Sequence, residues 1–389
     1  MLAGTNVALG VSGSIAAVKT VELAHELRRQ GAEVRAVMSD AARGIIHPWS
    51  LEFATENPVV TEITGSVEHV ELCGEEGWAD VLLLAPTTAN TVGKIASAID
   101  DTPVTTTVTT ALGADIPTVV APAMHEPMYD HPGVLEAIEH LESWGIEFVD
   151  PRIEEGKAKI ATEEAIVLEV ARAVGDRPLA GRHVVVTSGP TSEAIDPVRV
   201  ITNRASGRTG RAIAQACYVR GADVTLVHDG EEVPYAEVLS VESAAEMLEA
   251  VRSVAGEADA LVSAAAIGDF TVESEPEKIR SGQELTLELD PTPKLIDTIR
   301  EEHPGLPIVG FKLETGDDDE AMTEQARKTL QRADLSFVVA NDASVMGSET
   351  TRVLLVGTDD VTVAEGTKAE VSSRIADALA KELRASGSK

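Results

Sequence analysis

Apolar runs of strand length alternate with stretches of helical spacing along the whole chain, and this alternation is its strongest structural constraint. Strands that alternate with helices form βαβ units, in which parallel strands are joined by right-handed crossovers. The strand-like runs are 6–12, 32–39, 79–86, 116–122, 182–189, 222–230, 258–266, 306–312 and 335–342. The pattern therefore predicts an α/β fold with doubly wound, mainly parallel sheets.

The chain also carries a break in this pattern. The helical candidates are 16–30, 88–99, 208–221, 241–256, 320–333 and a closing helix from 372. The alternation is interrupted at VGDRPLAGRH (174–183), where Gly, Pro and charged residues occur together just before the strand-like run 182–189. A chain of 389 residues exceeds the size at which one hydrophobic core keeps growing. We therefore expect two Rossmann-like domains in tandem, 1–176 and 177–389.

The charge balance is strongly acidic, with 65 acidic and 32 basic residues and a formal net charge of −33. Such a charge repels phosphates, which argues against a nucleic-acid partner. The acidic residues are spread along the chain, as on a surface adapted to strongly screening salt, although an acidic ligand-binding face is the alternative. No window resembles a membrane span or a signal peptide, and Cys73 and Cys217 suggest no disulfide framework. We expect a cytoplasmic protein with no membrane partner.

Small and polar residues follow the first four strands at their carboxyl ends, where doubly wound folds bind ligands. In GVSGSIAAVK, backbone N–H groups between strand and helix can reach a phosphate, although a plain Gly/Ser turn is the alternative. The residues in question are Ser12, Gly13, Ser14, Ser39, APTTAN (85–90) and APAMHEPMYD (121–130). The last segment is too irregular to predict a helix. Together these four strand ends are typical of a mononucleotide site.

These segments, with His69 in SVEHVEL, resemble the flavin-dependent cysteine decarboxylases. They are most similar to the first half of the family of bifunctional phosphopantothenoylcysteine decarboxylases/phosphopantothenate–cysteine ligases. The resemblance implies FMN as cofactor. It places the FMN phosphate at Ser12, Gly13, Ser14 and Ser39, and the ring near Thr87, Thr88, Ala89 and Asn90.

The resemblance also implies a decarboxylase mechanism. A flavin that oxidises the cysteine thiol to a thioaldehyde gives the departing carboxylate an electron sink. His69 is then catalytic, whereas without the resemblance it would be an exposed strand residue. His125 stands where the family's best-known form has a carboxylate-binding asparagine, and a core histidine is the alternative. The family's lid cysteine, a proton donor, is absent from 151–166, so Lys159, or else Lys157 or water, is the candidate donor.

The segment VTSGPTSEAIDPVRVITNRASGRTG (186–210) carries the most specific signal in the chain. Its glycines and its S-G-x-x-G sequence expose N–H groups at a helix start, which suits a phosphate. The segment resembles the ligase signature of the same family nearly end to end. SAAAIGDF (263–270), EKIRS (277–281), PTPKLI (291–296), VGFKLET (309–315) and VVANDAS (338–344) follow in the family's order. Arg280, Ser281 and Lys294 depart from the family pattern.

The resemblance implies ligation of 4′-phosphopantothenate with cysteine through an acyl-cytidylate, with CTP as co-substrate and Mg²⁺ as its metal. Asn203 carries over as the residue that processes the acyl-cytidylate. The implied CTP contacts are Gly189, Ser206, Gly207, Gly210, Asp269, Lys278, Phe311, Lys312 and Asn341. The metal ligands are unassigned. The family further suggests a homo-oligomer with trimeric flavin-domain contacts and dimeric ligase-domain contacts.

Two other functions deserve comparison with this one. A flavoprotein of the first type can act as a regulatory binding module for a phosphatase, but the intact 186–210 segment argues against that. A ligase could instead be fused to a different flavin enzyme, such as a prenyl transferase. His69 together with PAMHEPM (122–128) argues against this second alternative.

Overall fold

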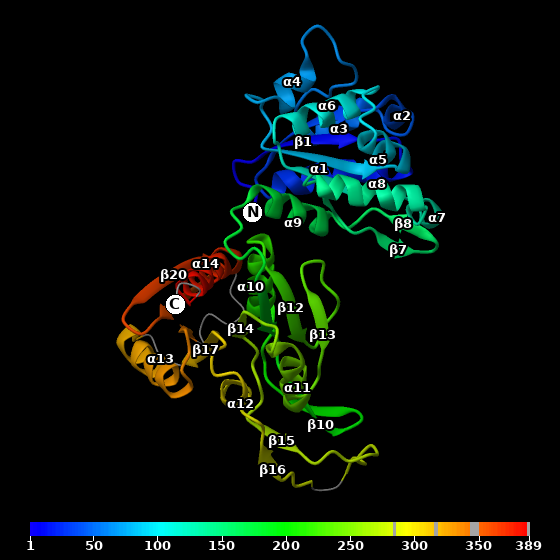
Figure 1. Ribbon diagram of the computed structural model, residues 1–389. Helices are drawn as coiled ribbons and strands as arrows, with labels where there is room; N and C mark the ends of the chain where they lie inside the picture. Colours follow the sequence, from blue (N-terminus) through cyan, green and yellow to red (C-terminus); the bar gives the residue numbers. More distant parts are fainter. Residues whose placement is uncertain (283–284, 315–317, 343–349, 387–389) are drawn as a thin grey trace. The chain divides into compact units, whose positions relative to one another are not determined.

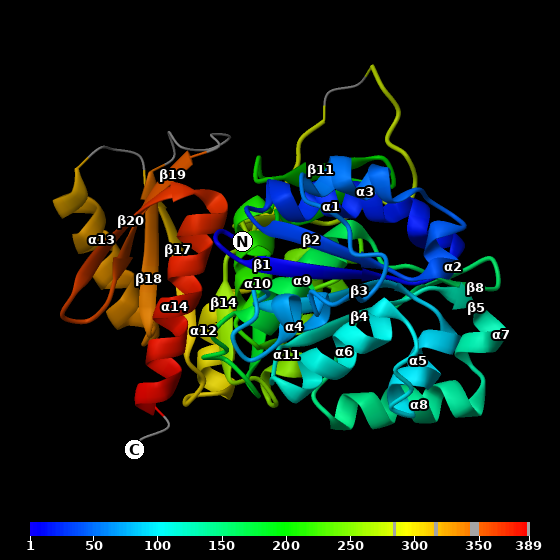
Figure 2. The same ribbon diagram turned by 90° about the horizontal axis from the view of Figure 1, so that it is seen from above.

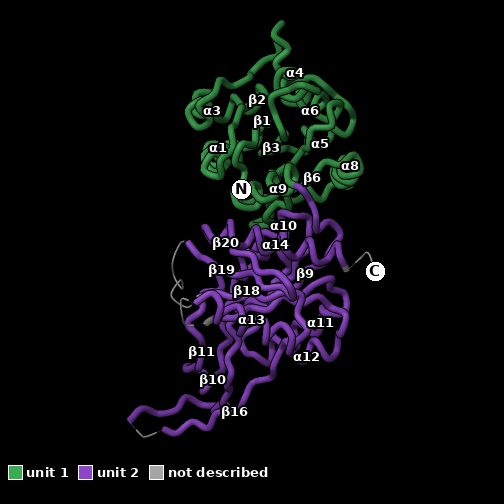
Figure 3. Tube along the Cα trace, turned by 90° about the vertical axis from the view of Figure 1, so that its left-hand side faces the viewer, with its two compact units in different colours: residues 1–175 green, residues 176–389 purple. Residues whose placement is uncertain are grey.

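The computed structural model describes residues 1–282, 285–314, 318–342 and 350–386. The chain divides into two compact units, Met1–Gly175 and Asp176–Lys389, which Figure 3 shows in different colours. Each unit has its own parallel sheet with helices packed on it, so the predicted tandem α/β architecture is confirmed. No helix within the described ranges is long and apolar enough to cross a membrane.

Unit 1 is built on a five-stranded parallel sheet in the order β2-β1-β3-β4-β6. The strands are β1 (Asn6–Val11), β2 (Glu33–Met38), β3 (Val81–Thr87), β4 (Thr118–Pro122) and β6 (Glu147–Phe148). Their apolar residues are buried on both faces, and every residue of β3 and β4 is buried. This explains why the strands read as continuous apolar runs rather than alternating ones.

Helices cover both faces of this sheet (Figures 1 and 2). Unit 1 contains η1 (Ile15–Lys19), α1 (Thr20–Arg29), α2 (Asp40–Arg43), α3 (Pro48–Thr55), α4 (Glu68–Cys73), α5 (Ala89–Ala96), α6 (Pro103–Gly113), α7 (Glu126–Tyr129), α8 (Pro132–Ser143) and α9 (Glu163–Val174). Apolar residues of α4, α5, α6 and α8 form one core cluster with the sheet. Helices α1 and α9 pack against each other and against the strands.

A small antiparallel sheet in unit 1 was not predicted. It consists of β5 (Met124–His125), β8 (Lys157–Lys159) and β7 (Arg152–Glu154), in that order. The segment 121–130 therefore supplies a two-residue strand and then the single helical turn α7, which the sequence did not predict. Pairing with residues far along the chain decides the conformation of this segment, and local propensity could not show that pairing.

Unit 2 is built on an eight-stranded sheet in the order β13-β12-β9-β14-β17-β18-β19-β20. The first six strands are parallel, and the last two continue antiparallel. The strands are β9 (His183–Thr187), β12 (Asp223–His228), β13 (Glu237–Ser240), β14 (Ala260–Ser263), β17 (Ile308–Glu314), β18 (Phe337–Asp342), β19 (Thr350–Val356) and β20 (Val361–Thr367). The helices are α10 (Arg208–Val219), α11 (Ala244–Ala255), α12 (Leu295–Glu302), α13 (Asp319–Ala333) and α14 (Lys368–Ser386).

Two further strand pairs leave the main sheet of unit 2. β10 (Ser192–Asp196) pairs with β11 (Arg199–Thr202), and β15 (Phe270–Val272) pairs with β16 (Leu289–Pro291). Figure 1 shows β10, β15 and β16 extending from the same end of the unit. The β10–β11 pair, here called the β10–β11 arm, lies within the 186–210 segment, and the β15–β16 pair contains Phe270 and Pro291 of two other motifs. Motif residues therefore lie on these two strand pairs as well as at the edge of the main sheet.

Candidate functional site

Ser12 joins the carboxyl ends of β1 and β3. Its side chain is 3% exposed, and its hydroxyl donates to the Pro86 carbonyl at 2.8 Å and accepts from the Thr88 N–H at 3.1 Å. Both hydrogen-bonding roles of this hydroxyl are thus engaged within the protein. Ser12 therefore fixes the shape of the turn that the sequence predicts as a phosphate site.

Gly13 lies where the β1 turn approaches α2 most closely. A Cβ atom at this position would stand 2.4 Å from the Cβ of Ala41, which real side chains do not tolerate. Ser14 caps η1 and its hydroxyl donates to the Ala123 carbonyl at 3.0 Å, while Ser39 caps α2 through the Ala42 N–H at 3.3 Å. The predicted residues from β1, β2 and β4 thus meet at one edge of the sheet.

The APTTAN segment closes this edge at the end of β3. Thr87 is fully buried, and its hydroxyl donates to the Leu84 carbonyl at 2.9 Å. Thr88 caps α5 by accepting the Thr91 N–H at 3.2 Å, and Asn90 is exposed in the first turn of α5. Ala89 begins the same helix. Both backbone groups of Thr88 are engaged, by the Ser12 hydroxyl and by the Val92 N–H, so the exposed side chain of Asn90 is the part of this segment most open to a ligand.

His69 lies in α4, so the segment SVEHVEL is helical rather than an exposed strand. Helix α4 packs on α6, and Figures 1 and 2 both place α4 nearer the amino ends of the strands than α2, α5 and α7. The Nδ1 atom of His69 is buried and has no hydrogen-bond partner in the described part of the chain. Unit 1 by itself therefore does not bring His69 to the carboxyl edge.

His125 lies at the mouth of β4, as the predicted site requires. Its side chain is exposed, and its backbone pairs with that of Lys157 across β5 and β8. The Nζ atom of Lys159 instead contacts Glu154 and Glu155, each at 3.0 Å. The hydrogen bonds that Lys159 donates to these two carboxylates raise its pKa above the ordinary value. Of the two lysines, Lys157 is the one placed beside His125.

Neither cysteine has the properties of a proton donor or nucleophile. Cys73 and Cys217 are free and buried, and burial raises the pKa of each thiol to about 12. Cys73 lies at the end of α4, and Cys217 lies in α10. Both thiols stay protonated near neutral pH, and both behave as small core residues.

Unit 2 has a cavity of about 700 Å³ at the carboxyl ends of its parallel strands. This volume is within the range of small-molecule sites. Six of the predicted nucleotide contacts line it: Gly189, Ser206, Gly207, Gly210, Phe311 and Asn341. Two arginines and a lysine join them in the wall: Arg204, Arg208 and Lys368. The cavity thus combines apolar surface, exposed backbone and three cationic side chains.

Backbone geometry explains the glycines of this cavity. Gly207 caps α10 with φ +68°, and Gly189 has φ +81°, a region that side chains rarely adopt. A Cβ atom at Gly210 would meet the Ser188 side chain at 2.6 Å and its Cα at 3.0 Å. The S-G-x-x-G motif therefore permits the start of α10 to lie directly against the end of β9.

The other predicted ligase residues do not line the cavity. Asn203 reaches its wall indirectly, because its Nδ2 donates to the Ala266 carbonyl at 2.8 Å. Lys312 stands between the lining residues Phe311 and Leu313 on β17. Because successive side chains of a strand point to opposite faces, the Lys312 side chain points away from the cavity. Lys278 is exposed on the segment between β15 and β16. Residue 315 of one motif and 343–344 of another lie outside the described residues.

Asp269 forms an ion pair with Lys294 at 2.7 Å. Lys294 is one of the departures from the family pattern, and it replaces an acidic residue. Both side chains are largely exposed, so the pair contributes little to stability. It nevertheless places a positive charge beside a carboxylate that the sequence predicts as a nucleotide contact.

The cavity wall also contains residues that sequence reasoning missed. Lys368, Val371 and Ser372 come from α14, and Thr351 and Val353 come from β19. No motif marks them, because they reach the cavity only through the antiparallel extension of the sheet and the return of the last helix. The scarcity of lysine in an acidic chain was the one signal that could have drawn attention to Lys368.

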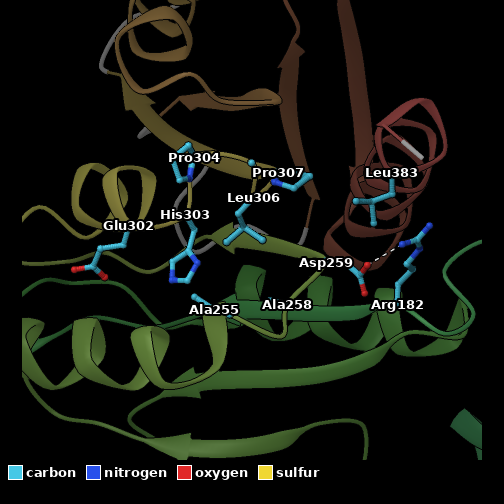
Figure 4. A pocket seen from close by; sticks show the side chains of 12 residues that line it. Arg182, Ala255, Ala258, Asp259, Glu302, His303, Pro304, Leu306, Pro307 and Leu383 are labelled. Carbon is cyan, nitrogen blue, oxygen red and sulfur yellow. Dashed lines mark hydrogen bonds and ion pairs between the residues drawn. The ribbon is translucent and has the colours of Figure 1, made fainter. Parts of the chain in front are cut away.

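A second hollow in unit 2, of about 570 Å³, lies at the amino ends of the strands. Figure 4 shows the ion pair between Arg182 and Asp259, at 2.7 Å, on one side and His303 on the other. None of the predicted site residues lines it. Ligands of doubly wound folds bind at the carboxyl edge, so the first cavity is the candidate site.

A metal site built from protein groups alone is not evident. Across the described ranges, no three His, Cys, Asp or Glu side chains gather closely enough to hold an ion. Mg²⁺ in nucleotide-binding enzymes commonly takes one or two carboxylates together with phosphate oxygens and water. The described residues thus assign no Mg²⁺ ligands, and the expected Mg²⁺ stays a prediction.

Comparison with known proteins gives matches over both units. Residues 1–175 match the family model Flavoprotein, and residues 179–383 match the model of the DNA/pantothenate metabolism flavoprotein C-terminal domain. Each model coincides with one compact unit almost completely. The chain therefore joins a flavoprotein unit to a second unit that carries the 186–210 motif.

Several curated relatives match over nearly the full chain. The coenzyme A biosynthesis bifunctional protein CoaBC of Thermococcus kodakarensis is 52% identical over 389 residues, which is 98% of this chain and 96% of the relative. The protein of the same name from Methanocaldococcus jannaschii is 36% identical over 390 residues, with 99% and 95% covered. That from Bacillus subtilis is 35% identical over 368 residues, with 90% and 88% covered.

Proposed function

The chain belongs to the family of bifunctional coenzyme A biosynthesis proteins, and from this premise we propose how its two units divide the work. It is a bifunctional enzyme, a phosphopantothenoylcysteine decarboxylase and a phosphopantothenate–cysteine ligase. We assign decarboxylation to 1–176 and ligation to 177–389. The observation that carries this division is the cavity of unit 2, whose wall contains six residues of the ligase motifs.

Ligation requires activation, because joining a carboxylate to an amine is uphill and a carboxylate oxygen leaves poorly. The carboxylate of 4′-phosphopantothenate attacks the α-phosphorus of CTP, which releases pyrophosphate and leaves an acyl-cytidylate. The amine of cysteine then attacks the acyl carbon and displaces CMP. The start of α10 holds the triphosphate through the N–H groups around Gly207 and the charges of Arg204 and Arg208. Mg²⁺ arrives with the nucleotide.

Asn203 acts at the reacting carbonyl group. Its amide is held by the Ala266 carbonyl, and Ala266 lines the cavity. The same contact leaves the amide oxygen of Asn203 available to the incoming amine. Lys278 is exposed on the arm between β15 and β16 and makes no ion pair in the described part of the chain. A lysine so placed can reach negative charge that develops as pyrophosphate leaves.

The carboxyl edge of unit 1 fits FMN. Gly13 packs too closely on α2 to carry a side chain, and this packing fixes the β1 turn beside Ser14 and Ser39, where backbone N–H groups suit a phosphate. The exposed side chain of Asn90 lies at the same edge and suits the ring. When bound, the flavin supplies the two-electron oxidation and reduction that make decarboxylation possible. His125 holds the substrate carboxylate, and Lys157 or Lys159 delivers a proton.

His69 completes the decarboxylase site only in an oligomer. Its helix α4 packs on α6, away from α2, α5 and α7, yet its Nδ1 atom is buried with no hydrogen-bond partner among the described residues. Unit 1 also exposes four large apolar side chains by 55% to 78%: Ile15, Val18, Trp49 and Phe53. A second copy that covers these side chains can place its His69 at the flavin edge of the first. Trimeric contacts between flavin units and dimeric contacts between ligase units follow the family.

The compartment that suits this enzyme is the cytoplasm. Both cysteines are free and buried, which is compatible with a reducing compartment. Its substrates are small molecules, and its charge of −33 disfavours nucleic acid as a partner.

A coupled assay tests the two activities. The purified protein should be yellow. It should release pyrophosphate when CTP, Mg²⁺, 4′-phosphopantothenate and cysteine are all present, and it should then evolve CO₂. ATP in place of CTP tests the nucleotide preference. A colourless protein that cannot be reconstituted with FMN, or one that leaves CTP intact with both co-substrates, would contradict the proposal. The two relevant alternatives, a regulatory module and a different flavin enzyme, predict no CO₂.

A further inference from the structure

Two helices begin at the cavity of unit 2, and the sequence motifs account for only one of them. α10 begins there with Arg208, as the 186–210 segment predicts. α14 begins there as well, and it contributes Lys368, Val371 and Ser372 to the wall. These three positions are spaced i, i+3 and i+4, so a single stripe on the first turns of α14 faces the cavity.

Ser372 carries a hydroxyl with unsatisfied hydrogen-bonding capacity. Its side chain is 1% exposed, and its Oγ atom has no hydrogen-bond partner in the described part of the chain. A helical serine can usually donate to the carbonyl four residues earlier, which would satisfy it. A buried hydroxyl without a partner is unfavourable in the free protein. Because Ser372 lines the cavity, a ligand there can supply the missing acceptor.

The surroundings of Ser372 favour an anionic ligand. α14 is nineteen residues long, so its aligned peptide dipoles place partial positive charge at its start. Lys368 adds a full positive charge there. Glu370 lies in the same turn, but its carboxylate is engaged by the N–H of Thr367 at 2.7 Å and by its hydroxyl at 3.0 Å.

α10 and α14 pack against each other, and both helices begin at the same cavity. Arg204 and Arg208 at the start of α10 therefore stand in one space with Lys368. The chain as a whole has a net charge of −33, so a cavity wall with three cationic side chains differs from the general composition of the protein. Such a wall suits an anionic ligand. Two phosphate-binding positions can thus exist in one cavity, one at each helix start.

We propose that Lys368 and Ser372 form a phosphate subsite at the start of α14, separate from the cradle at the start of α10. The proposal rests on the proposed ligase function. Its ligand is a phosphate group of a ligase substrate, either in the triphosphate of the nucleotide or in the phosphate monoester of the acid. The Ser372 hydroxyl donates to a phosphate oxygen, and the Lys368 ammonium neutralises its charge. Neither residue takes part in bond breaking.

Steady-state kinetics of Ser372→Ala and Lys368→Gln test the subsite. Lys381→Gln is the matched control, because Lys381 lies exposed near the other end of the same helix. We expect each variant at the subsite to raise the KM of one phosphate-bearing substrate by about five- to tenfold. The KM of cysteine and CO₂ release from supplied 4′-phosphopantothenoylcysteine should match the control. A raised KM for CTP identifies the triphosphate, and a raised KM for 4′-phosphopantothenate identifies the monoester.

Three further results separate this subsite from a structural role. Ser372→Ala should leave the melting temperature of the ligand-free protein unchanged or higher, since it removes an unsatisfied buried group. If the KM of CTP rises, inhibition by inorganic tripolyphosphate should weaken by the same factor, and unchanged inhibition would overturn the subsite. KM values that stay within about twofold of Lys381→Gln would overturn it too. A wild-type enzyme without ligase turnover would instead count against the proposed function.

Discussion

The buried carboxylate of Asp196 accepts a hydrogen bond from the backbone N–H of Ile279 at 3.1 Å, across eighty-three positions of sequence. The same carboxylate accepts the N–H groups of Val198 and Arg199 at 2.8 and 2.9 Å and pairs with the Arg199 guanidinium. Burial alone would raise the pKa of Asp196, but these hydrogen bonds hold it below its ordinary value. Asp196 thereby ties the β10–β11 arm to the segment that carries Lys278.

Asp196→Asn should impair ligation and leave decarboxylation intact. The substitution removes the charge that holds Arg199 and weakens the contact to Ile279, so Lys278 loses its fixed position. We expect the kcat/KM of the ligase to fall by more than about tenfold, since a buried charged network is broken. Pyrophosphate release and CO₂ release, measured separately, check this. Asp259→Asn is the control, because Asp259 pairs with Arg182 at the opposite edge of the sheet; an equal loss in both variants would contradict the assignment.

Gly13→Ala should abolish flavin retention. The added Cβ would stand 2.4 Å from the Cβ of Ala41 and 3.1 to 3.2 Å from its backbone, so the β1 turn must move. Overpacking of this kind costs roughly 1–3 kcal/mol, and here it displaces the predicted phosphate contacts. Flavin content follows from the absorbance ratio of the purified protein.

Gly93→Ala is the control, because a Cβ at Gly93 in α5 would meet no atom within 4 Å, and this variant should keep the flavin. A Gly13→Ala protein that stays yellow would show that the β1 turn is not part of the flavin site.

Lys157→Ala should slow the reductive half of the decarboxylase reaction more than Lys159→Ala does. Lys159 contacts Glu154 and Glu155, and its raised pKa makes it a weaker acid than an ordinary lysine. Lys157 pairs with His125 across β5 and β8. Rapid-mixing spectroscopy of flavin reoxidation, alongside CO₂ release, separates the two halves of the reaction. A larger effect of Lys159→Ala would restore Lys159 as the donor, and no effect in either variant would favour water.

His228 should make unit 2 less stable as the pH falls below about 6.5, the ordinary pKa of histidine. Both of its ring nitrogens are buried without a hydrogen-bond partner in the described part of the chain, and the side chain is 2% exposed. Burial lowers the pKa of His228, and the charge of Arg211 lowers it further. The backbone of Glu231 and the charges of Asp229 and Glu232 act in the opposite direction and offset only part of this shift. On acidification His228 is therefore protonated in the unfolded chain before it is protonated in the folded chain, so the free energy of unfolding falls as the pH falls.

Melting temperatures of wild type and His228→Gln between pH 8 and pH 5 check this effect. The wild type should lose stability across that interval, and the variant should show a flatter profile. Carboxylates with lowered pKa, such as that of Asp196, lose their contribution only at lower pH. Identical slopes in the two proteins would show that His228 is not the group responsible.

Added salt should stabilise the whole enzyme. With a net charge of −33, repulsion among acidic side chains opposes folding, and at 1 M salt the Debye length shrinks to about 3 Å. We expect the melting temperature to rise steeply from 0.05 M to 1 M KCl and to change little between NaCl and KCl. A flat or falling profile would contradict a surface adapted to high salt.

Several features of this protein were determined by its sequence alone. The apolar runs at 6–12, 79–86 and 182–189 became central strands, because a strand buried on both faces must be apolar throughout. The S-G-x-x-G segment began a helix at Arg208, as a local signal can specify. Motif order and composition were likewise enough to predict the family, which the comparisons confirmed.

Only the tertiary structure decided which of these residues meet. Lys312 is next to Phe311 in sequence but leaves the other face of β17, whereas Ser372 reaches the cavity from the last helix. Likewise, Lys159 forms ion pairs with Glu154 and Glu155, and His69 lies in a helix away from the carboxyl edge of the sheet. The physical reason is that the spacing of apolar residues in the sequence shows which face of a single helix or strand is buried, but not which segment covers that face. The partner of a side chain depends on the register of the paired strands and on where other segments return to the sheet, and one element's pattern does not contain that information.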